Sequence, residues 1–158
     1  MNAELNELLL RLLRARSTAA LGTLRTGAPF VSMVPYAIAI DGSGFVVHVS
    51  TLAAHTKDML ADARVSLLVA EAEGAGKSPL GLMRVSVQGL ARQIASEAPE
   101  LPGLRAAYLA RFPDAEPMFG FGDFSIFLIQ PESARFVAGF GQAHSISAAS
   151  LAQLLRQS

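Results

Sequence analysis

One stretch in the first half of the chain constrains its fold most, because it reads as a strand, a short helix and a second strand in immediate succession. Phe45–Ser50 carries mostly β-branched, aromatic and imidazole side chains, which are common in sheets. Ser50 and Thr51 then offer hydroxyls that suit a helix N-cap, so we expect a helix over Leu52–Leu60. Arg64–Ala70 reads as the second strand. The sequence therefore places the start of a short helix at the end of a strand.

The start of this helix is a candidate anion site. The first N–H groups of a helix lack partners within it, and the aligned peptide dipoles make that end positive. His55, Thr56 and Lys57 would add side-chain donors beside it. The same residues also fit an ordinary surface helix, so the local chemistry alone leaves both interpretations open.

The rest of the chain predicts a mostly antiparallel sheet with helices outside it. Leucines 5, 8, 9, 12 and 13 have the spacing of an amphipathic helix. Further strands are expected over Thr18–Leu24, Phe30–Ile40 with a break at Pro35, Met83–Ala95 and Asp123–Gln130, with Ala134–Phe140 continuing the sheet. Further helices are expected within Glu97–Phe112, after Pro102, and over Leu151–Arg156. Strands of this number and spacing suggest a small closed or partly open barrel.

Glycines and phenylalanines add detail to this fold. Asp41–Gly44 should close a hairpin, and Gly89 should mark a bulge or a close approach of two backbones. Clustered phenylalanines usually belong to a core, so we expect this of the following four: Phe119, Phe121, Phe124 and Phe127.

A segment that ends in Gly76, Lys77 and Ser78 superficially matches a nucleotide-binding P-loop. That motif requires an earlier glycine where this chain has Glu71, whose carboxylate would repel phosphate. Pro79 follows at once and is a poor start for the long helix that a P-loop needs. We therefore interpret the segment as a solvated loop.

Composition excludes several classes of function. Thirteen basic and thirteen acidic residues give a net charge of zero without a basic run, so no nucleic-acid surface is expected. The absence of cysteine excludes disulfides, thiol nucleophiles and cysteine-based zinc sites, and we expect no metal site. The acidic N-terminus does not resemble a signal peptide, and no apolar run approaches the roughly 18–20 residues of a membrane span. We expect a single cytoplasmic domain over residues 1–158, with neither nucleic acid nor membrane as a partner.

The composition is nevertheless unusually apolar. Hydrophobic residues make up 51% of the chain and charged residues only 16%, against about 25% charged in an average protein. A monomer of this size would have to expose part of that surplus, and large exposed apolar areas commonly mark contact surfaces. We expect a homo-oligomer, most simply a two-fold dimer.

Six segments carry a family resemblance: Leu21–Leu24, Gly27–Tyr36, Ser50–Leu60, Arg64–Val69, Met83–Gly89 and Ala138–Ala143. Their order and spacing resemble the split-barrel flavoproteins related to pyridoxamine 5′-phosphate oxidase, and within these the haem-utilisation branch. No single motif is specific to the family, but the succession is. The resemblance implies a mainly β (α+β) fold, an antiparallel split β-barrel with peripheral helices, and a homodimer with FMN at the subunit interface.

The resemblance also implies cofactor-binding residues. It places FMN beside Ser32, Met33, Val34, Pro35, Val49, Ser50 and Thr51, and its phosphate beside His55, Thr56 and Arg84. Asp58 departs from the amide that the family pattern leads us to expect. No catalytic residue is assigned.

Two departures concern the substrate. The oxidase itself carries a lysine where this chain has Ala37, and its C-terminal arginine- and histidine-bearing segment has no counterpart in Gly139–His144. We therefore expect pyridoxamine 5′-phosphate to be a poor substrate, although the chain has the features of the family.

Three functions stay open. The first is an FMN-dependent oxidoreductase with a small-molecule substrate of unknown identity, working by hydride transfer at the flavin. The second is a haem-binding or haem-degrading protein, whose iron ligand would come from His48, His55 or His144, with His144 the strongest candidate. The third is a flavin-binding protein without enzymatic activity. Nucleophilic hydrolysis is disfavoured, because the sequence lacks a Gly-x-Ser-x-Gly motif.

Overall fold

Eight strands form one antiparallel sheet in the computed structural model, which describes residues 1–157. The strands are β1 (Thr18–Arg25), β2 (Ala28–Pro35), β3 (Ala37–Ile38), β4 (Phe45–Ser50), β5 (Arg64–Ala70), β6 (Arg84–Gln93), β7 (Phe124–Val137) and β8 (Ala143–Ser147). The helices are α1 (Ala3–Ala15), α2 (Ala54–Ala61), α3 (Leu101–Arg111) and α4 (Ala148–Leu155), with 3₁₀ turns η1 (Pro79–Gly81) and η2 (Pro113–Gly120).

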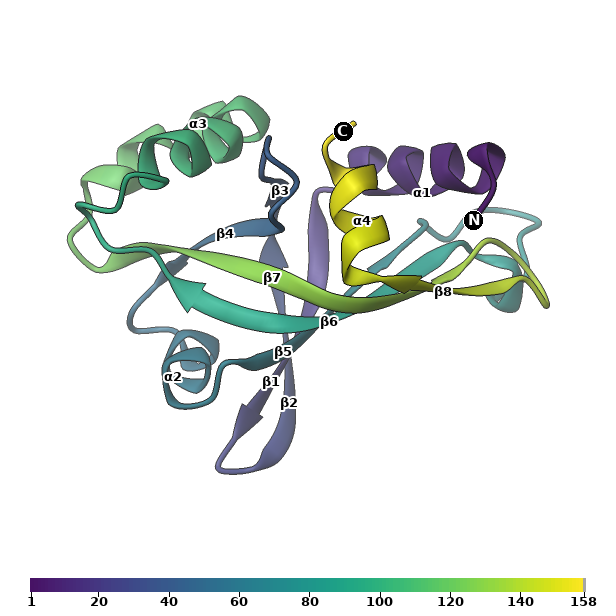
Figure 1. Cartoon of the computed structure of the whole chain (residues 1–158). Coiled ribbons are helices and arrows are strands. Elements are labelled where there is room, and N and C mark those ends of the chain that lie inside the picture. The colour runs from purple at the N-terminus through teal and green to yellow at the C-terminus, as the bar shows by residue number, and fades with distance from the viewer. Residues whose placement is uncertain (158) are drawn as a thin grey trace.

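The order of the strands does not follow the order of the chain. It runs β2-β1-β5-β6-β7-β4-β3, and β8 pairs with the end of β7. In Figure 1 the sheet curls, with α3 at one end, α1 and α4 at the other, and α2 on the side away from these three helices. This confirms the predicted antiparallel split barrel with peripheral helices.

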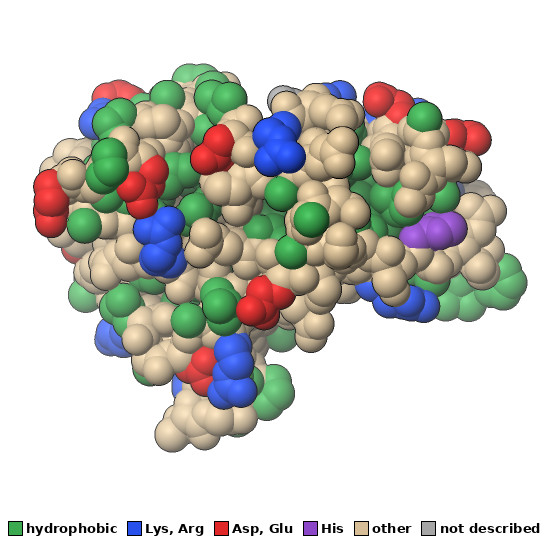
Figure 2. Space-filling model, viewed as in Figure 1, with side chains coloured by type: hydrophobic (Ala, Val, Ile, Leu, Met, Phe, Trp, Pro, Cys, Tyr) green, Lys and Arg blue, Asp and Glu red, His purple; other side chains and the backbone are tan. Residues whose placement is uncertain are grey.

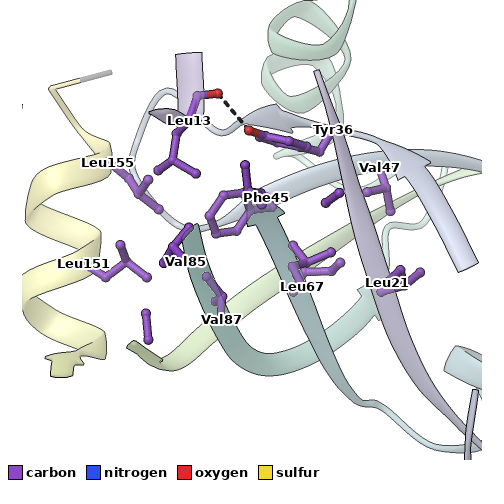
Figure 3. Close-up of a cluster of buried hydrophobic side chains, with 14 of the residues drawn as sticks. Leu13, Leu21, Tyr36, Phe45, Val47, Leu67, Val85, Val87, Leu151 and Leu155 are labelled. Carbon is purple, nitrogen blue, oxygen red and sulfur yellow. Dashed lines mark hydrogen bonds between the residues drawn. The ribbon is translucent and has the colours of Figure 1, made fainter. Parts of the chain in front are cut away.

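The core fills the inside of the curled sheet and is closed by α1 and α4 (Figure 3). It includes Leu9, Leu13, Leu21, Tyr36, Phe45, Val47, Leu67, Val85, Val87, Phe127, Ile129, Phe136, Leu151 and Leu155. A second cluster joins α3 to the other face of β4 and β7, and includes Val46, Leu104, Tyr108, Ile126 and Leu128. β4 thus has a core on both of its faces, which explains its continuous apolar sequence.

Helix α1 is fixed at both of its ends. Asn2 caps the start, because its side-chain oxygen accepts a hydrogen bond from the N–H of Leu5 at 2.9 Å. At the other end the Tyr36 hydroxyl donates to the carbonyl of Leu13 at 2.8 Å (Figure 3). Arg111 donates to the carbonyls of Leu13 at 3.1 Å and Arg14 at 3.3 Å, and also contacts the carbonyl of Arg16. Carbonyls at a helix end lack partners within the helix, and here Arg111 of α3 and Tyr36, which directly follows β2, supply the donors.

Gly89 marks the predicted bulge. The pairing of β6 with β7 shifts register there, and a Cβ atom on residue 89 would lie only 2.3 Å from the carbonyl oxygen of Gln130. Pro131 lies opposite and has no N–H to donate, so the bulge lets β7 continue through a proline. The prediction of two segments, Asp123–Gln130 and Ala134–Phe140, is therefore wrong, because β7 is one continuous strand.

Other element boundaries also differ from the predictions. α2 begins at Ala54, and its N-cap residue Ala53 makes no side-chain cap, so neither Ser50 nor Thr51 caps it. The Ser50 hydroxyl instead accepts a hydrogen bond from the N–H of Leu52 in the turn before the helix. This local hydrogen bond occupies the Ser50 hydroxyl, which is therefore not available to cap α2; serine hydroxyls often bond to nearby backbone in this way.

Later in the chain, α3 spans Leu101–Arg111, and α4 begins at Ala148, three residues before the predicted start. Strand β8 was not predicted. Of the four phenylalanines, Phe127 is buried, but the side chain of Phe121 is 52% exposed, so the prediction of a common core is wrong for Phe121.

The segment that resembles a P-loop is a solvated loop, as predicted. Most of residues 71–78 are exposed, and the ammonium group of Lys77 forms an ion pair with Glu71. Only the short turn η1 follows, so no helix presents its N-terminus to a phosphate here.

Acidic and basic side chains are interspersed on the face of the molecule shown in Figure 2. No helix within residues 1–157 is long and apolar enough to cross a membrane.

Candidate functional site

Hydrogen bonds hold the turn between β4 and α2 in one conformation. The N–H of Thr51 donates to the carbonyl of Asp123 at 2.6 Å, which ties the turn to the start of β7. The Ser50 hydroxyl contacts the Asp123 carboxylate at 3.3 Å. The Thr56 hydroxyl donates to the carbonyl of Ser50 at 2.6 Å. The end of β4 and the first turn of α2 therefore form a rigid unit.

The start of α2 retains the features of an anion site. No side chain of the described part of the chain caps this helix, so its first-turn N–H groups have no side-chain partner. His55 is half-buried beside this turn and Lys57 is exposed. Burial lowers the pKa of His55, and the Asp58 carboxylate opposes this only in part, so the imidazole is neutral at pH 7. It can therefore donate one hydrogen bond but adds no charge.

A partly buried ion pair lies directly behind this turn, in which the side chain of Asp58 is 6% exposed and that of Arg25 is 39% exposed. Asp58 accepts hydrogen bonds from the Thr23 hydroxyl at 2.9 Å and from Nε and Nη2 of Arg25, both at 3.1 Å. The bonds from Arg25 hold the pKa of Asp58 below its ordinary value, with a smaller contribution from Thr23, although burial opposes both. The guanidinium carbon of Arg25 also lies 3.6 Å from the centre of the Phe30 ring. This pair joins α2 to the β1–β2 hairpin.

The contact between Arg25 and Asp58 was not predicted from the sequence. The sequence shows that the two residues carry opposite charges, but they come into contact only because α2 packs against β1. Because both oxygens of Asp58 are occupied by donors, the residue has a structural role at this position.

The four predicted residues of β2 alternate in exposure, as expected of a strand with one face to the core. Val34 is buried, whereas Met33 is 65% exposed and Pro35 ends the strand at the edge of the sheet. The Ser32 hydroxyl is buried and has no hydrogen-bond partner within residues 1–157. An unpaired buried hydroxyl is costly, and a bound polar group would satisfy it.

The structure brings most of the predicted site residues together. Val49 is buried at the end of β4, directly before the turn, and β2 contacts β4. Thr56 is fully buried behind the turn, so its hydroxyl faces Ser50 and not the solvent. The binding roles of these residues remain predictions.

Arg84 lies elsewhere in the chain. It pairs with Ala70 at the far end of β5, whereas Arg64, at the end of β5 beside α2, pairs with Leu90. At about 3.3 Å per residue, this register separates Arg84 from the α2 end of β6 by roughly 20 Å. Its guanidinium donates to the carbonyl of Leu82 at 2.9 Å. One copy of the chain does not bring Arg84 to His55.

The three histidines occupy three different surroundings. His55 lies beside α2, and His48 is buried on β4 beneath α3. His144 lies on β8, opposite Phe136, and is half-buried. It lines a cleft of about 440 Å³ between β8 and the start of α1, together with Leu5, Leu8 and the 141–143 turn.

Known proteins with a similar sequence or fold include several named for haem. The chloroplastic heme oxygenase HOZ of Arabidopsis thaliana is 39% identical over 117 residues, which cover 74% of this chain and 34% of that protein. Heme oxygenase HutZ of Vibrio cholerae is 28% identical over 134 residues, which cover 84% of this chain and 75% of that protein. The chain thus spans about a third of the chloroplastic relative.

A solved structure with a similar sequence has the same fold as this chain. The heme binding protein from Mycobacterium smegmatis superposes with a TM-score of 0.84 at 27% identity, over 97% of this chain and 62% of that protein. Residues 5–138 match the pyridoxamine 5′-phosphate oxidase family, a range that includes all the predicted cofactor-binding residues. With its antiparallel split barrel, this chain belongs to the pyridoxamine 5′-phosphate oxidase family.

Proposed function

We propose that this chain binds haem. The observation that carries the proposal is its likeness to two proteins named heme oxygenase, at 39% and 28% identity over most of this chain. The structural neighbour named heme binding protein agrees with it. Haem binding was the alternative to a flavin-dependent oxidoreductase on the sequence alone, and the named relatives give it the stronger support.

His144 is the residue we assign to the haem iron. Histidine is a common protein ligand of haem iron, and His144 lies in a cleft with the apolar side chains of Leu5 and Leu8. His48 is enclosed beneath α3, and His55 is beside the candidate anion site at α2. A cleft of about 440 Å³ would cover part of a macrocycle. A second copy of the chain would be needed to cover the rest.

Titration of the protein with haem tests this proposal. We expect a Soret band typical of histidine-ligated iron, and we expect His144→Ala to abolish it. His55→Ala is the matched control, because it removes a half-buried histidine of the same type from another part of the molecule and should leave the band unchanged. Binding no tighter than to an unrelated protein, or a His144→Ala variant that titrates like the parent, would refute the proposal.

FMN binding at the turn between β4 and α2 is a second candidate function. The unpartnered hydroxyl of Ser32, the uncapped start of α2 and the exposed apolar side chain of Met33 support it. FMN, when bound, supplies the hydride-transfer chemistry of an oxidoreductase, or serves only as cargo if the protein is not an enzyme. The residues of this chain would position the flavin and its phosphate.

A comparison of FMN with riboflavin tests the phosphate assignment. His55→Ala combined with Arg84→Ala should weaken FMN binding far more than riboflavin binding, because each lost charge-assisted contact costs about 1.5–3 kcal/mol. Since Arg84 is remote from His55 within one chain, this assignment also requires that a second copy supplies Arg84. Equal losses for both ligands would show that the two residues are structural.

We expect pyridoxamine 5′-phosphate to be a poor substrate. Ala37 is buried and uncharged where the oxidase has a lysine, so a substrate phosphate would lack that cation. Steady-state assays should give turnover well below the roughly 1–10 per second of ordinary enzymes. Turnover in that range would refute this expectation.

We also propose that the chain forms a homodimer through the outer face of the sheet. Val31 and Met33 of β2 are 66% and 65% exposed, and the register places Leu68 of β5 on the same face, where it is 41% exposed. A monomer would leave this apolar face in water. A second copy would cover it and accounts for the high apolar content of the chain.

A further inference from the structure

A cleft of about 520 Å³ lies beneath α3, next to the turn between β4 and α2 because Ser125 and Phe124 of its lining pair with Val49 and Ser50, and away from the cleft that holds His144. Its floor comes from His48 of β4, Gln93 of β6 and Ser125 of β7, and its walls come from Arg105 of α3 and Phe119 of η2. In Figure 1 this end of the sheet, below α3, is remote from β8 and the start of α1, where His144 lies. The volume is within the range of small-molecule sites, about 300–1,000 Å³.

His48 is the least expected residue of this cleft. Its side chain is only 8% exposed, and neither ring nitrogen has a hydrogen-bond partner within residues 1–157. Nδ1 is sealed from solvent, so the part of the ring that reaches the cleft is the edge that carries Nε2. A neutral imidazole with its proton on Nε2 would present a donor to the cleft.

Aromatic rings hold His48 in place. Its ring stacks on Phe119, with centroids 3.8 Å apart and planes 4° from parallel, and it meets Tyr108 edge-on at 5.7 Å. Phe124 contacts it at 5.2 Å. Together with the apolar side chain of Ile126 on the floor, these rings give the cleft a surface suited to a flat, apolar group.

The polar groups around this surface are mainly hydrogen-bond donors. The guanidinium carbon of Arg105 lies 4.9 Å from the centre of the Phe119 ring. Arg105 also forms an ion pair with Glu116 at 2.8 Å. Exposed ion pairs contribute little free energy, so a bound carboxylate can take the place of Glu116. The Gln93 amide donates to the Ser125 hydroxyl at 3.1 Å, which leaves the proton of that hydroxyl available. Burial and the charge of Arg105 both lower the pKa of His48, so the ring is neutral at pH 7.

We infer that this cleft binds a small aromatic monocarboxylate. The ring of the ligand would pack against Phe119 and Phe124, and its carboxylate would accept hydrogen bonds from Arg105 and from Nε2 of His48. Arginine forms a bidentate ion pair with a carboxylate, and a neutral amide in the ligand cannot form such a pair. Glu97 lies on the rim and would repel a second negative charge, which favours one carboxylate over two.

Calorimetric titration with three probes tests the ligand class. Benzoate should bind with a Kd of about 1 mM or tighter. Benzamide keeps the ring but lacks the charge, and acetate keeps the charge but lacks the ring, so both should bind at least tenfold more weakly. No saturable binding of benzoate in the millimolar range, or equal binding of benzoate and benzamide, would overturn the inference.

Three variants test the assigned residues. Arg105→Gln should weaken benzoate at least tenfold, whereas the matched control Arg92→Gln, which also loses an exposed arginine–glutamate pair, should bind it like the parent. His48→Phe keeps an aromatic ring against Phe119 and should weaken benzoate severalfold. If that variant does not fold, the ¹⁵N shift of His48 in the parent serves instead, and benzoate should change it. Benzoate binding that is unchanged in Arg105→Gln would overturn the assignment. So would benzoate binding that is unchanged in His48→Phe together with a ¹⁵N shift of His48 that benzoate does not alter in the parent.

Discussion

At the scale of single residues, Asp58 has the most closely defined surroundings in the chain. Three donors from two side chains of β1 surround its carboxylate, and folding lowers its pKa. A group with a lowered pKa stabilises the fold fully above its unfolded-state pKa, about 3.9, and loses this contribution as the pH falls through the folded-state pKa. The contribution of Asp58 should therefore be complete at pH 7 and disappear in acid.

The variant Asp58→Asn tests this contribution. At pH 7 it should unfold at a lower urea concentration than the parent, because an amide is a poor acceptor for Arg25. Below about pH 3.9 the difference in the free energy of unfolding should shrink, since the parent then loses its carboxylate too. Glu116→Gln, which removes only an exposed ion pair, is the control and should change little at either pH. A difference between parent and Asp58→Asn that stays constant with pH would contradict the argument.

At the scale of elements, the end of α1 depends on residues outside α1. Arg111 supplies the carbonyls of Leu13, Arg14 and Arg16 with donors, and charged hydrogen bonds are worth about 1.5–3 kcal/mol each when measured by mutation. We expect Arg111→Met to destabilise the protein and to increase amide hydrogen exchange in the last turn of α1. Arg92→Met, which loses an exposed pair, should change neither property. Unchanged exchange in Arg111→Met would show that α1 holds its end without this residue.

Two glycine substitutions should have opposite effects. Gly89→Ala would push a methyl group against the carbonyl oxygen of Gln130, a backbone atom that cannot move aside, and should cost about 1–3 kcal/mol. Gly103→Ala lies within α3, where the added methyl group meets no atom within 4 Å, and should stabilise by about 0.5–1 kcal/mol. Thermal unfolding of both variants measures the two effects. A Gly89→Ala variant as stable as the parent would show that the bulge tolerates a side chain.

At the scale of the whole molecule, the proposed dimer predicts a large interface. It should bury more than about 1,000 Å² and be more apolar than the remaining surface. Val31→Glu combined with Met33→Glu should give a monomer in sedimentation, because both charges would lie on the contact face. Leu80→Glu is the control, since Leu80 is 62% exposed in η1, outside the sheet, and should leave the dimer intact. A parent that sediments as a stable monomer at micromolar concentration would remove both the dimer and any interfacial site.

Much of this fold could be predicted because local patterns and tertiary structure agree. The leucine spacing of α1 and the β-branched run of β4 each predict one structure, and the structure confirms both. Gly89 was predicted to mark a bulge or a close approach of two backbones, and it marks both. Strand β8 was missed because Ala143–Ser147 has only one large apolar residue, Ile146, and forms a strand by pairing with β7. Its pattern alone gives no reason to expect this.

The candidate site could be predicted where its residues are contiguous in sequence. Ser50, Thr51 and His55 follow one another through the turn, and the structure keeps them together. The pair of Arg25 with Asp58 and the cleft around His48 bring together residues from different elements. No spacing in one sequence encodes such contacts, so they became visible only with the packing of α2 on β1 and of α3 on β4.

The position of β4 between β7 and the short β3 also has a consequence for synthesis on the ribosome. Phe45 pairs with Ile129 and Ser50 pairs with Phe124, so β4 cannot pair with β7 until residues 124–129 have been translated. The hairpin of β1 with β2, and later the pairing of β5 with β6, can form early, because these contacts are close in sequence. Until β7 has been translated, β4 has only the two-residue strand β3 as a neighbour and its other edge stays exposed, a state that favours aggregation or chaperone binding. Nascent chains stalled before residue 124 should therefore bind a chaperone, and chains released after residue 137 should not.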